Sequence, residues 1–148
     1  TQPLAMRTTD YRYGIDIVDG DDAWKMFCAA ADGDVKTISR LAKKDPRLVD
    51  AQFWYQFPLH LAAWQNQIEA AKRLLELGAN IGHSHWWYRS WDRLLPLLQQ
   101  RDFTEMASLI QTAMQERFGY DPDFEPLKKA AVERDLKVVG KLLKKGRN

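Results

Sequence analysis

The sequence predicts an all-α fold, a solenoid of stacked helix-turn-helix units. Three observations predict it: one apolar spacing that occurs four times, nearly constant steps between those occurrences, and a shorter apolar stretch before each one. Each set has apolar residues at i, i+3, i+6 and i+7, which is one face of a helix. The sets are Val35, Ile38, Leu41 and Ala42; Ile68, Ala71, Leu74 and Leu75; Phe103, Met106, Leu109 and Ile110; and Leu136, Val139, Leu142 and Leu143.

Each set reads as the second helix of a pair. Successive sets lie 33, 35 and 33 residues apart, and each follows a stretch (MFCAA, LHLAA, LLPLL or LKKAA) and a short polar turn. Because an isolated helix pair cannot bury such a face, we expect the units to stack on their neighbours. The predicted organisation is an N-terminal arm or cap, residues 1–20, followed by a single repeat domain, residues 21–148. Its units cover approximately 21–53, 54–86, 87–122 and 123–148.

Composition sets the class of protein. With 148 residues, 45% of them apolar and 28% charged, the chain can bury the core of one domain. No apolar run approaches the ~20 residues of a membrane-spanning helix, and TQPLAMRTTD lacks the basic start and apolar stretch of a signal peptide. We therefore expect a cytoplasmic monomer without membrane contact. The single cysteine, Cys28, falls in an apolar helical stretch, where we expect it to be buried.

The arm and the first helix follow from local patterns. YRYGIDIV, residues 11–18, alternates enough to predict a short strand or an extended cap over the first unit, with a linker to another domain as the alternative. Asp21 or Asp22 is the expected start of the first helix, because Asp side chains accept hydrogen bonds from free N–H groups at helix N-termini.

The second unit carries a family resemblance. FPLHLAAWQNQIEAAKRLLELGANI, residues 57–81, resembles an ankyrin repeat, whose pattern is T-P-L-H-x-A-A, a turn, a second helix and G-A-x-V/I. The resemblance implies an ankyrin-repeat solenoid with hairpin-like finger loops between units. It also implies a concave surface, made by fingers and inner helices, that generally recognises other proteins. The matching residues are Pro58, Leu59, His60, Ala62, Ala63, Gly78, Ala79 and Ile81.

Two departures from that pattern have structural consequences. The third unit has Pro96 inside its first helix, where proline removes a backbone donor and clashes with the preceding turn, so we expect a shortened or kinked helix around Asp92 to Gln100. In the second unit, Phe57 replaces the Thr toward which the family's histidine hydrogen-bonds. We expect His60 to have a structural role, with some of that bracing lost.

Aromatic residues recur on adjacent fingers. HSHWWYRSW, residues 83–91, lies between units two and three, and its rings follow those of QFWYQF, residues 52–57, at an offset of 33. Either these rings pack on each other and on the inner helices, or they form a partner-binding surface. Trp64 stands where ankyrin units commonly point into the groove, with Ala31, Gln99 and Val132 as its equivalents. The predicted partner-binding residues are Trp54, Tyr55, Trp64, Gln65, His85, Trp86, Trp87, Tyr88 and Arg89.

No motif of enzyme chemistry is present. The sequence lacks a glycine-rich phosphate loop, Cys-x-x-Cys, His-Glu-x-x-His and Gly-x-Ser-x-Gly, so we predict no enzyme, no catalytic residue and no cofactor. His83 and His85 could reach one metal ion, since residues two apart in a strand face one side. The remaining histidine is the distant His60, so no metal ligand is predicted.

The predicted function is a non-enzymatic module that binds a protein or peptide partner through aromatic fingers and the concave inner-helix face. One alternative is a structural or regulatory segment of a larger enzyme or effector. Another is nucleic-acid binding by the basic end of the chain, residues 126–148, with eight Lys or Arg against two acidic residues. That reading is weaker, because lysines at helical spacing usually mark a solvated face.

Overall fold

The computed structural model describes residues 1–13, 16–53, 56–81 and 91–118. The chain divides into two compact units, Thr1–Ala113 and Met114–Asn148. The described residues form three helix pairs: α1 (Gly20–Asp32) with α2 (Val35–Lys44), α3 (Pro58–Trp64) with α4 (Ile68–Glu76), and α5 (Trp91–Gln100) with α6 (Thr104–Phe118). The predicted fourth unit, 123–148, lies outside the described residues.

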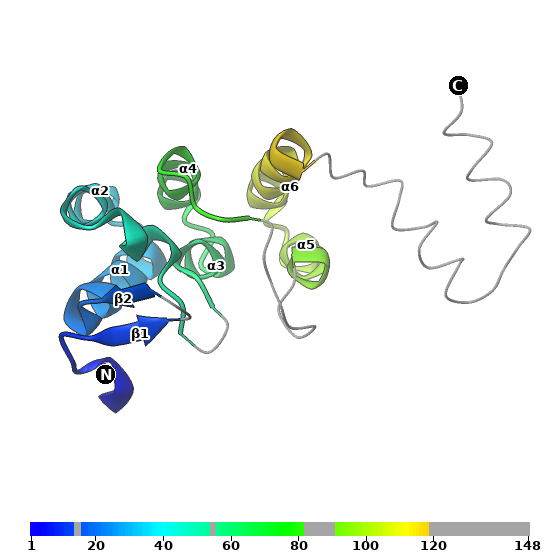
Figure 1. Cartoon of the computed structure of the whole chain (residues 1–148). Coiled ribbons are helices and arrows are strands. Elements are labelled where there is room, and N and C mark those ends of the chain that lie inside the picture. Colours follow the sequence, from blue (N-terminus) through cyan, green and yellow to red (C-terminus); the bar gives the residue numbers. More distant parts are fainter. Residues whose placement is uncertain (14–15, 54–55, 82–90, 119–148) are drawn as a thin grey trace, which may run out of the picture. The chain divides into compact units, whose positions relative to one another are not determined.

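The first compact unit has two rows of helices. Figure 1 shows α1, α3 and α5 in one row and α2, α4 and α6 in the other. The apolar faces predicted for α2 and α4 lie between the rows, so the all-α helical repeat is confirmed. Hydrophobic burial of this kind stabilises a fold by about 25 cal/mol per Å² of apolar surface. The buried residues include Ile38, Leu41, Ala42, Leu59, Ala62, Ala63, Ala71, Leu74 and Leu75.

The turn inside each pair has the same backbone geometry. Gly33, Asn66 and Asp102 have φ angles of 78°, 56° and 58°, in the left-handed region that Gly, Asn and Asp adopt most readily. After each of them, a backbone N–H donates to the carbonyl five residues earlier. These bonds run from Asp34 to Ala29 at 2.8 Å, from Gln67 to Ala62 at 2.8 Å, and from Phe103 to Leu98 at 2.9 Å.

These turns define the register of the units and correct two predictions. Phe103 occupies the place of Asp34 and Gln67, just before the outer helix, so the third apolar set was wrong by one residue. In the same register Gln100, not Gln99, is the equivalent of Trp64. The spacing could not resolve this because α6 has adjacent apolar residues. Met106, Ala107 and Ile110 are buried, whereas Leu109 is half-buried.

Two helix boundaries also differ from prediction. α1 begins at Gly20, because Asp19 accepts a hydrogen bond from the N–H of Asp22 at 2.9 Å. The start predicted at Asp21 or Asp22 was therefore late, and both residues lie in the first turn, where acidic side chains favour the helix dipole. Of the shortening or kink expected at Pro96, the shortening is wrong, since α5 runs for ten residues with Pro96 inside it. Pro96 is exposed, so the missing N–H is on the solvent side.

The N-terminal arm packs against the first helix pair. It contains η1 (Leu4–Met6) and two antiparallel strands, β1 (Tyr11–Tyr13) and β2 (Asp16–Val18), where the alternating pattern predicted one short strand or an extended cap. The N–H of Gly20 donates to the carbonyl of Thr8 at 2.7 Å, and a Cβ at Gly20 would collide with the carbonyl oxygens of Met6 and Thr8. The arm therefore depends on close backbone approach. The domain division at residue 20 remains a prediction.

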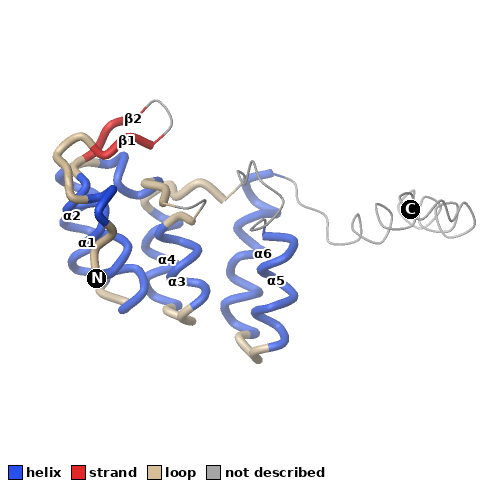
Figure 2. Tube along the Cα trace, turned by 90° about the horizontal axis from the view of Figure 1, so that it is seen from below, coloured by secondary structure: helices blue, strands red, loops and turns tan. Residues whose placement is uncertain are grey.

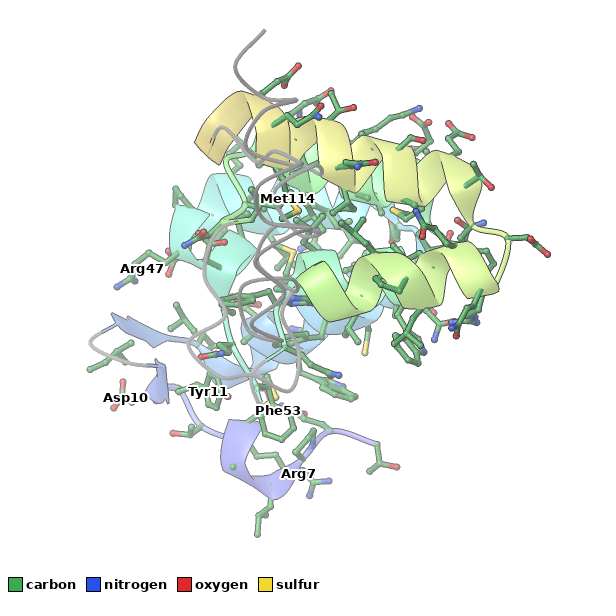
Figure 3. All side chains as sticks on the ribbon, turned by 90° about the vertical axis from the view of Figure 1, so that its right-hand side faces the viewer. Arg7, Asp10, Tyr11, Arg47, Phe53 and Met114 are labelled. Carbon is green, nitrogen blue, oxygen red and sulfur yellow. The ribbon has the colours of Figure 1, made fainter. Side chains whose placement is uncertain are left out.

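A hairpin-like finger joins the first and second pairs, after η2 (Pro46–Asp50). Phe53 and Gln56 exchange backbone hydrogen bonds of 3.0 and 2.9 Å, which confirms the finger at this junction. The hydroxyl of Tyr11 donates to the carbonyl of Gln52 at 2.6 Å, and Figure 3 shows Tyr11 of the arm near the segment that carries Phe53. The arm thus holds the base of this finger.

Candidate partner-binding site

The structure describes two of the predicted partner-binding residues, Trp64 and Gln65. The others lie outside the described residues: Trp54, Tyr55, His85, Trp86, Trp87, Tyr88 and Arg89. His83, weighed as a metal ligand, lies outside them as well.

Trp64 is the last residue of α3 and is 45% exposed, although Ala62 and Ala63 directly before it are fully buried. The helix ends here because Asn66 adopts the left-handed conformation. Figure 2 shows the turns within the helix pairs along one edge, and the strands of the arm at the opposite edge. Seven helical residues span ~10 Å, so Trp64 and the base of the first finger lie at opposite ends of α3.

Arg101 holds Trp64 from the next helix pair. Its guanidinium lies 5.4 Å from the centroid of the Trp64 ring and 4.6 Å from that of Phe103. The same group donates from Nη1 to the carbonyl oxygen of Trp64 at 2.9 Å. A guanidinium over an aromatic face contributes ~0.5–1 kcal/mol at an exposed site. Neither Arg101 nor Phe103 was predicted as a site residue from the sequence. A charged residue such as Arg101 in a turn usually indicates solvent contact alone.

The first turn is tied to the second in a similar way. Gln67 donates from Nε2 to the carbonyl oxygen of Ala31 at 3.1 Å. Ala31 and Trp64 are equivalent in the turn register, so in each of these inner helices a carbonyl of the last turn accepts a side-chain hydrogen bond from the following unit. Such bonds satisfy backbone acceptors that a helix end leaves free. A Cβ at Gly33 would collide with the Gln67 amide, which adds to the requirement for glycine.

The inner helices present an apolar row to one side of Trp64. In the turn register, Cys28 of α1, Leu61 of α3 and Leu97 of α5 are equivalent. Cys28 and Leu61 are half-buried and Leu97 is 39% exposed. The prediction that Cys28 is buried was wrong, because it lies off the face of α1 that buries Met26 and Ala29.

The surroundings of the Cys28 thiol disfavour its thiolate form. Partial burial, and then the negative charge of Asp32, raise the pKa of Cys28 above its ordinary value. A nucleophilic cysteine needs the opposite shift, because the thiolate is the reactive form. Cys28 is therefore best understood as part of the apolar row.

His60 has the structural role predicted for it. It is 6% exposed, and its Nδ1 accepts a hydrogen bond from the backbone N–H of Phe57 at 3.1 Å. The rings of Phe57 and His60 stack with their centroids 5.4 Å apart. Phe57 thus replaces the expected Thr contact with ring packing and still anchors the start of α3.

Neither a metal-binding cluster nor a membrane-spanning helix is found among the described residues. Within them, no group of three or more His, Cys, Asp or Glu side chains is arranged to hold a metal ion. No helix in this part of the chain has the length and apolar composition needed to cross a membrane.

Stacked helix pairs joined by left-handed turns define an α-helical repeat protein. Residues 55–85 match the family model described as Ankyrin repeat, a range that contains α3, its turn and α4 together with Trp64 and Gln65. Residues 55–85 are therefore an ankyrin repeat. Ankyrin repeats are protein-protein interaction modules and are typically non-enzymatic. The match covers one unit, so the predicted number of four units remains a prediction. No curated protein matches the chain.

Proposed function

We propose that this chain is a non-enzymatic module that binds a protein or peptide partner through its inner-helix face, with Trp64 at the centre of the described part. The carrying observation is that Trp64 is 45% exposed while its backbone and ring are both held by Arg101. The proposed surface also includes Gln65 and the finger residues Trp54, Tyr55, His85, Trp86, Trp87, Tyr88 and Arg89.

The energetics of protein interfaces support this assignment. Trp and Arg are enriched among the few residues that contribute most of the binding free energy. A ring whose rotamer is already restrained loses little conformational entropy when a partner covers it. Trp64 meets both conditions, and the neighbouring Leu61 and Leu97 add apolar surface that a partner could cover.

The test begins by capturing partners on the immobilised chain and identifying one that binds directly. Its Kd is then measured by calorimetry for the wild type, for Trp64→Ala and for Leu4→Ala. Leu4 is the matched control, since it is 82% exposed but belongs to η1 of the arm. We expect Trp64→Ala to weaken binding by ~1–2 kcal/mol, about 5- to 30-fold, and Leu4→Ala to leave it unchanged.

Thermal unfolding of each variant, recorded in the same buffer, shows that binding is compared between folded proteins. Trp64→Ala is expected to lower Tm moderately, because the residue is only 45% exposed in the free chain. Unchanged affinity of folded Trp64→Ala would reject this surface as the binding site.

A further inference from the structure

We infer that the segment recognised at this site is an apolar stretch of a protein chain with opposite charges at its ends, a basic side chain placed at Asp32 and an acidic side chain placed at Arg101. This inference rests on the proposed function and specifies the partner of the same site.

The charge pattern follows from the register of the turns. Asp32, Gln65 and Arg101 each stand directly before the left-handed residue of their turn, so they form one row across the three inner helices. All three are exposed. The row therefore changes from negative at the end of α1, through neutral just after α3, to positive just after α5. It runs beside Trp64 and the apolar row of Cys28, Leu61 and Leu97.

Both charged residues are available to a partner. Within the described part of the chain, neither Asp32 nor Arg101 takes part in an ion pair, whereas Glu105 lies 3.6 Å from Lys72. Arg101 uses Nη1 for the carbonyl of Trp64, and a guanidinium has five N–H donors in one plane. A carboxylate can approach the remaining donors while the ring contacts persist.

The nearby acid on α2 is committed to structure. Asp34 accepts a hydrogen bond from the N–H of Thr37 at 3.0 Å and caps α2. Asp32, at the end of α1, stands in the row itself and caps no described helix, so we assign the partner's cation to it. This assignment makes the negative end of the surface a single side chain that can be removed without loss of a helix cap.

The spacing limits the length of the partner segment. Packed helices lie ~8–10 Å apart, and Arg101 leans from the third pair toward Trp64 on the second, so the two charges are separated by about 10–20 Å. An extended chain covers that distance with about three to six residues. A polyphosphate strand is disfavoured, because Asp32 would repel it at one end.

The test is selection from a displayed library of random peptides of about 12 residues, twice the longest expected span. The immobilised full chain is compared with Asp32→Asn, Arg101→Gln and Trp64→Ala. We expect the wild type to enrich peptides in which a basic and an acidic residue bracket apolar residues at the spacing above. Asp32→Asn should lose the basic preference alone, and Arg101→Gln the acidic preference alone.

One enriched peptide is then synthesised with Glu and with Gln at its acidic position. On the wild type, the Glu form should bind at least about threefold tighter, as expected for a partly exposed ion pair, and added salt should reduce the difference. On Arg101→Gln the two forms should bind equally. Arg101→Lys, which keeps the charge, should retain part of the preference and serves as the control for altered packing of Trp64.

The outcomes separate this inference from the proposed function. Apolar peptides without paired charges, lost on Trp64→Ala, would overturn the charge assignment and leave the binding site intact. Enriched peptides that bind Trp64→Ala as tightly as wild type would overturn both. Failure to enrich any peptide would count against both as well.

Discussion

The guanidinium of Arg101 lies 5.4 Å from the centroid of the Trp64 ring and donates a 2.9 Å hydrogen bond to the carbonyl oxygen of the same residue. One side chain thus restrains both the ring and the helix end that carries it. Because Arg101 follows α5 and Trp64 ends α3, the contact also joins two helix pairs. The proposed binding surface and a contact between two helix pairs therefore share these two residues.

A double-mutant cycle on this pair should show coupling. Trp64→Ala, Arg101→Ala and the double variant are compared by urea unfolding, and we expect a coupling free energy of ~0.5–1 kcal/mol from the lost cation–π contact. The hydrogen bond from Arg101 to the backbone carbonyl of residue 64 remains possible in Trp64→Ala. The coupling free energy therefore reports the contact between the guanidinium and the ring alone. Leu4→Ala combined with Arg101→Ala is the control, and its effects should add. Additive effects for Trp64 and Arg101 as well would mean that the ring contact contributes nothing to stability.

Gly20→Ala should dislodge the N-terminal arm. A Cβ at Gly20 would collide with the carbonyl oxygens of Met6 and Thr8, which are backbone atoms that cannot rotate away. We expect a loss of ~1–3 kcal/mol in the free energy of unfolding and faster trypsin cleavage after Arg7. Gly78→Ala is the matched control, because Gly78 has φ 94° but open space around its Cβ. It should lower stability through backbone strain while cleavage at Arg7 stays slow. If trypsin cleaved after Arg7 as slowly in Gly20→Ala as in the wild type, the arm would be shown to tolerate the change.

The helix pairs could be predicted from the sequence because apolar periodicity is a local property. The faces of α2 and α4 were found correctly, and a short polar stretch marks the turn before each of these helices. The one-residue error at Phe103 arose because α6 buries the adjacent residues Met106 and Ala107, so two registers satisfy the same spacing. The start of α1 was misplaced because Asp19, Asp21 and Asp22 are all plausible caps and backbone geometry selects the first.

The candidate site was less predictable than the fold. Trp64 was identified through its place in the repeat, but its contact with Arg101 spans 37 residues and depends on how two helix pairs stack. Cys28 was assigned to the core because its neighbours are apolar, yet its position around α1 places it beside Leu61 in the turn register. Which residues share an exposed face could be specified only after the turns had fixed the register.

His60→Phe should isolate the hydrogen bond that anchors α3. The variant keeps a ring that can stack on Phe57, but it removes the Nδ1 acceptor for the N–H of Phe57. Leaving a buried donor without that acceptor costs ~1–3 kcal/mol, so we expect a loss of that size in urea unfolding. Leu61→Ala, on the half-buried face of the same helix, controls for a general weakening of α3. Wild-type stability for His60→Phe would assign the anchoring to ring packing alone.

Asp34→Asn should reduce the fall in the free energy of unfolding at acidic pH. Hydrogen bonds from the backbone and side chain of Thr37 hold the pKa of Asp34 below its ordinary value of 3.8. A lowered folded-state pKa gives stability that is present above the unfolded-state value and is lost as pH falls through the folded-state value. Asn caps helices about as well as Asp but does not titrate. Relative to wild type, the variant should gain stability in urea unfolding as the pH falls below the ordinary value of 3.8. Asp10→Asn, an exposed residue outside the helix caps, is the control, and parallel acid profiles for wild type and Asp34→Asn would contradict the prediction.

Alkylation of Cys28 should report whether a partner covers the apolar row. Burial and the charge of Asp32 raise the pKa of Cys28, so the thiolate fraction at pH 8 is small and iodoacetamide should react more slowly than with a free cysteine. Because Asp32 contributes to that shift, Asp32→Asn should increase the alkylation rate of Cys28 in the free chain.

A saturating concentration of a peptide from the selection should slow the alkylation of wild-type Cys28 several-fold further, since Cys28 lies in the row beside Trp64. In a Cys28→Ser, Leu4→Cys variant the thiol is on the arm, and the same peptide should leave its rate unchanged. An unchanged rate at Cys28 with bound peptide would mean that the partner contacts Trp64 without covering α1.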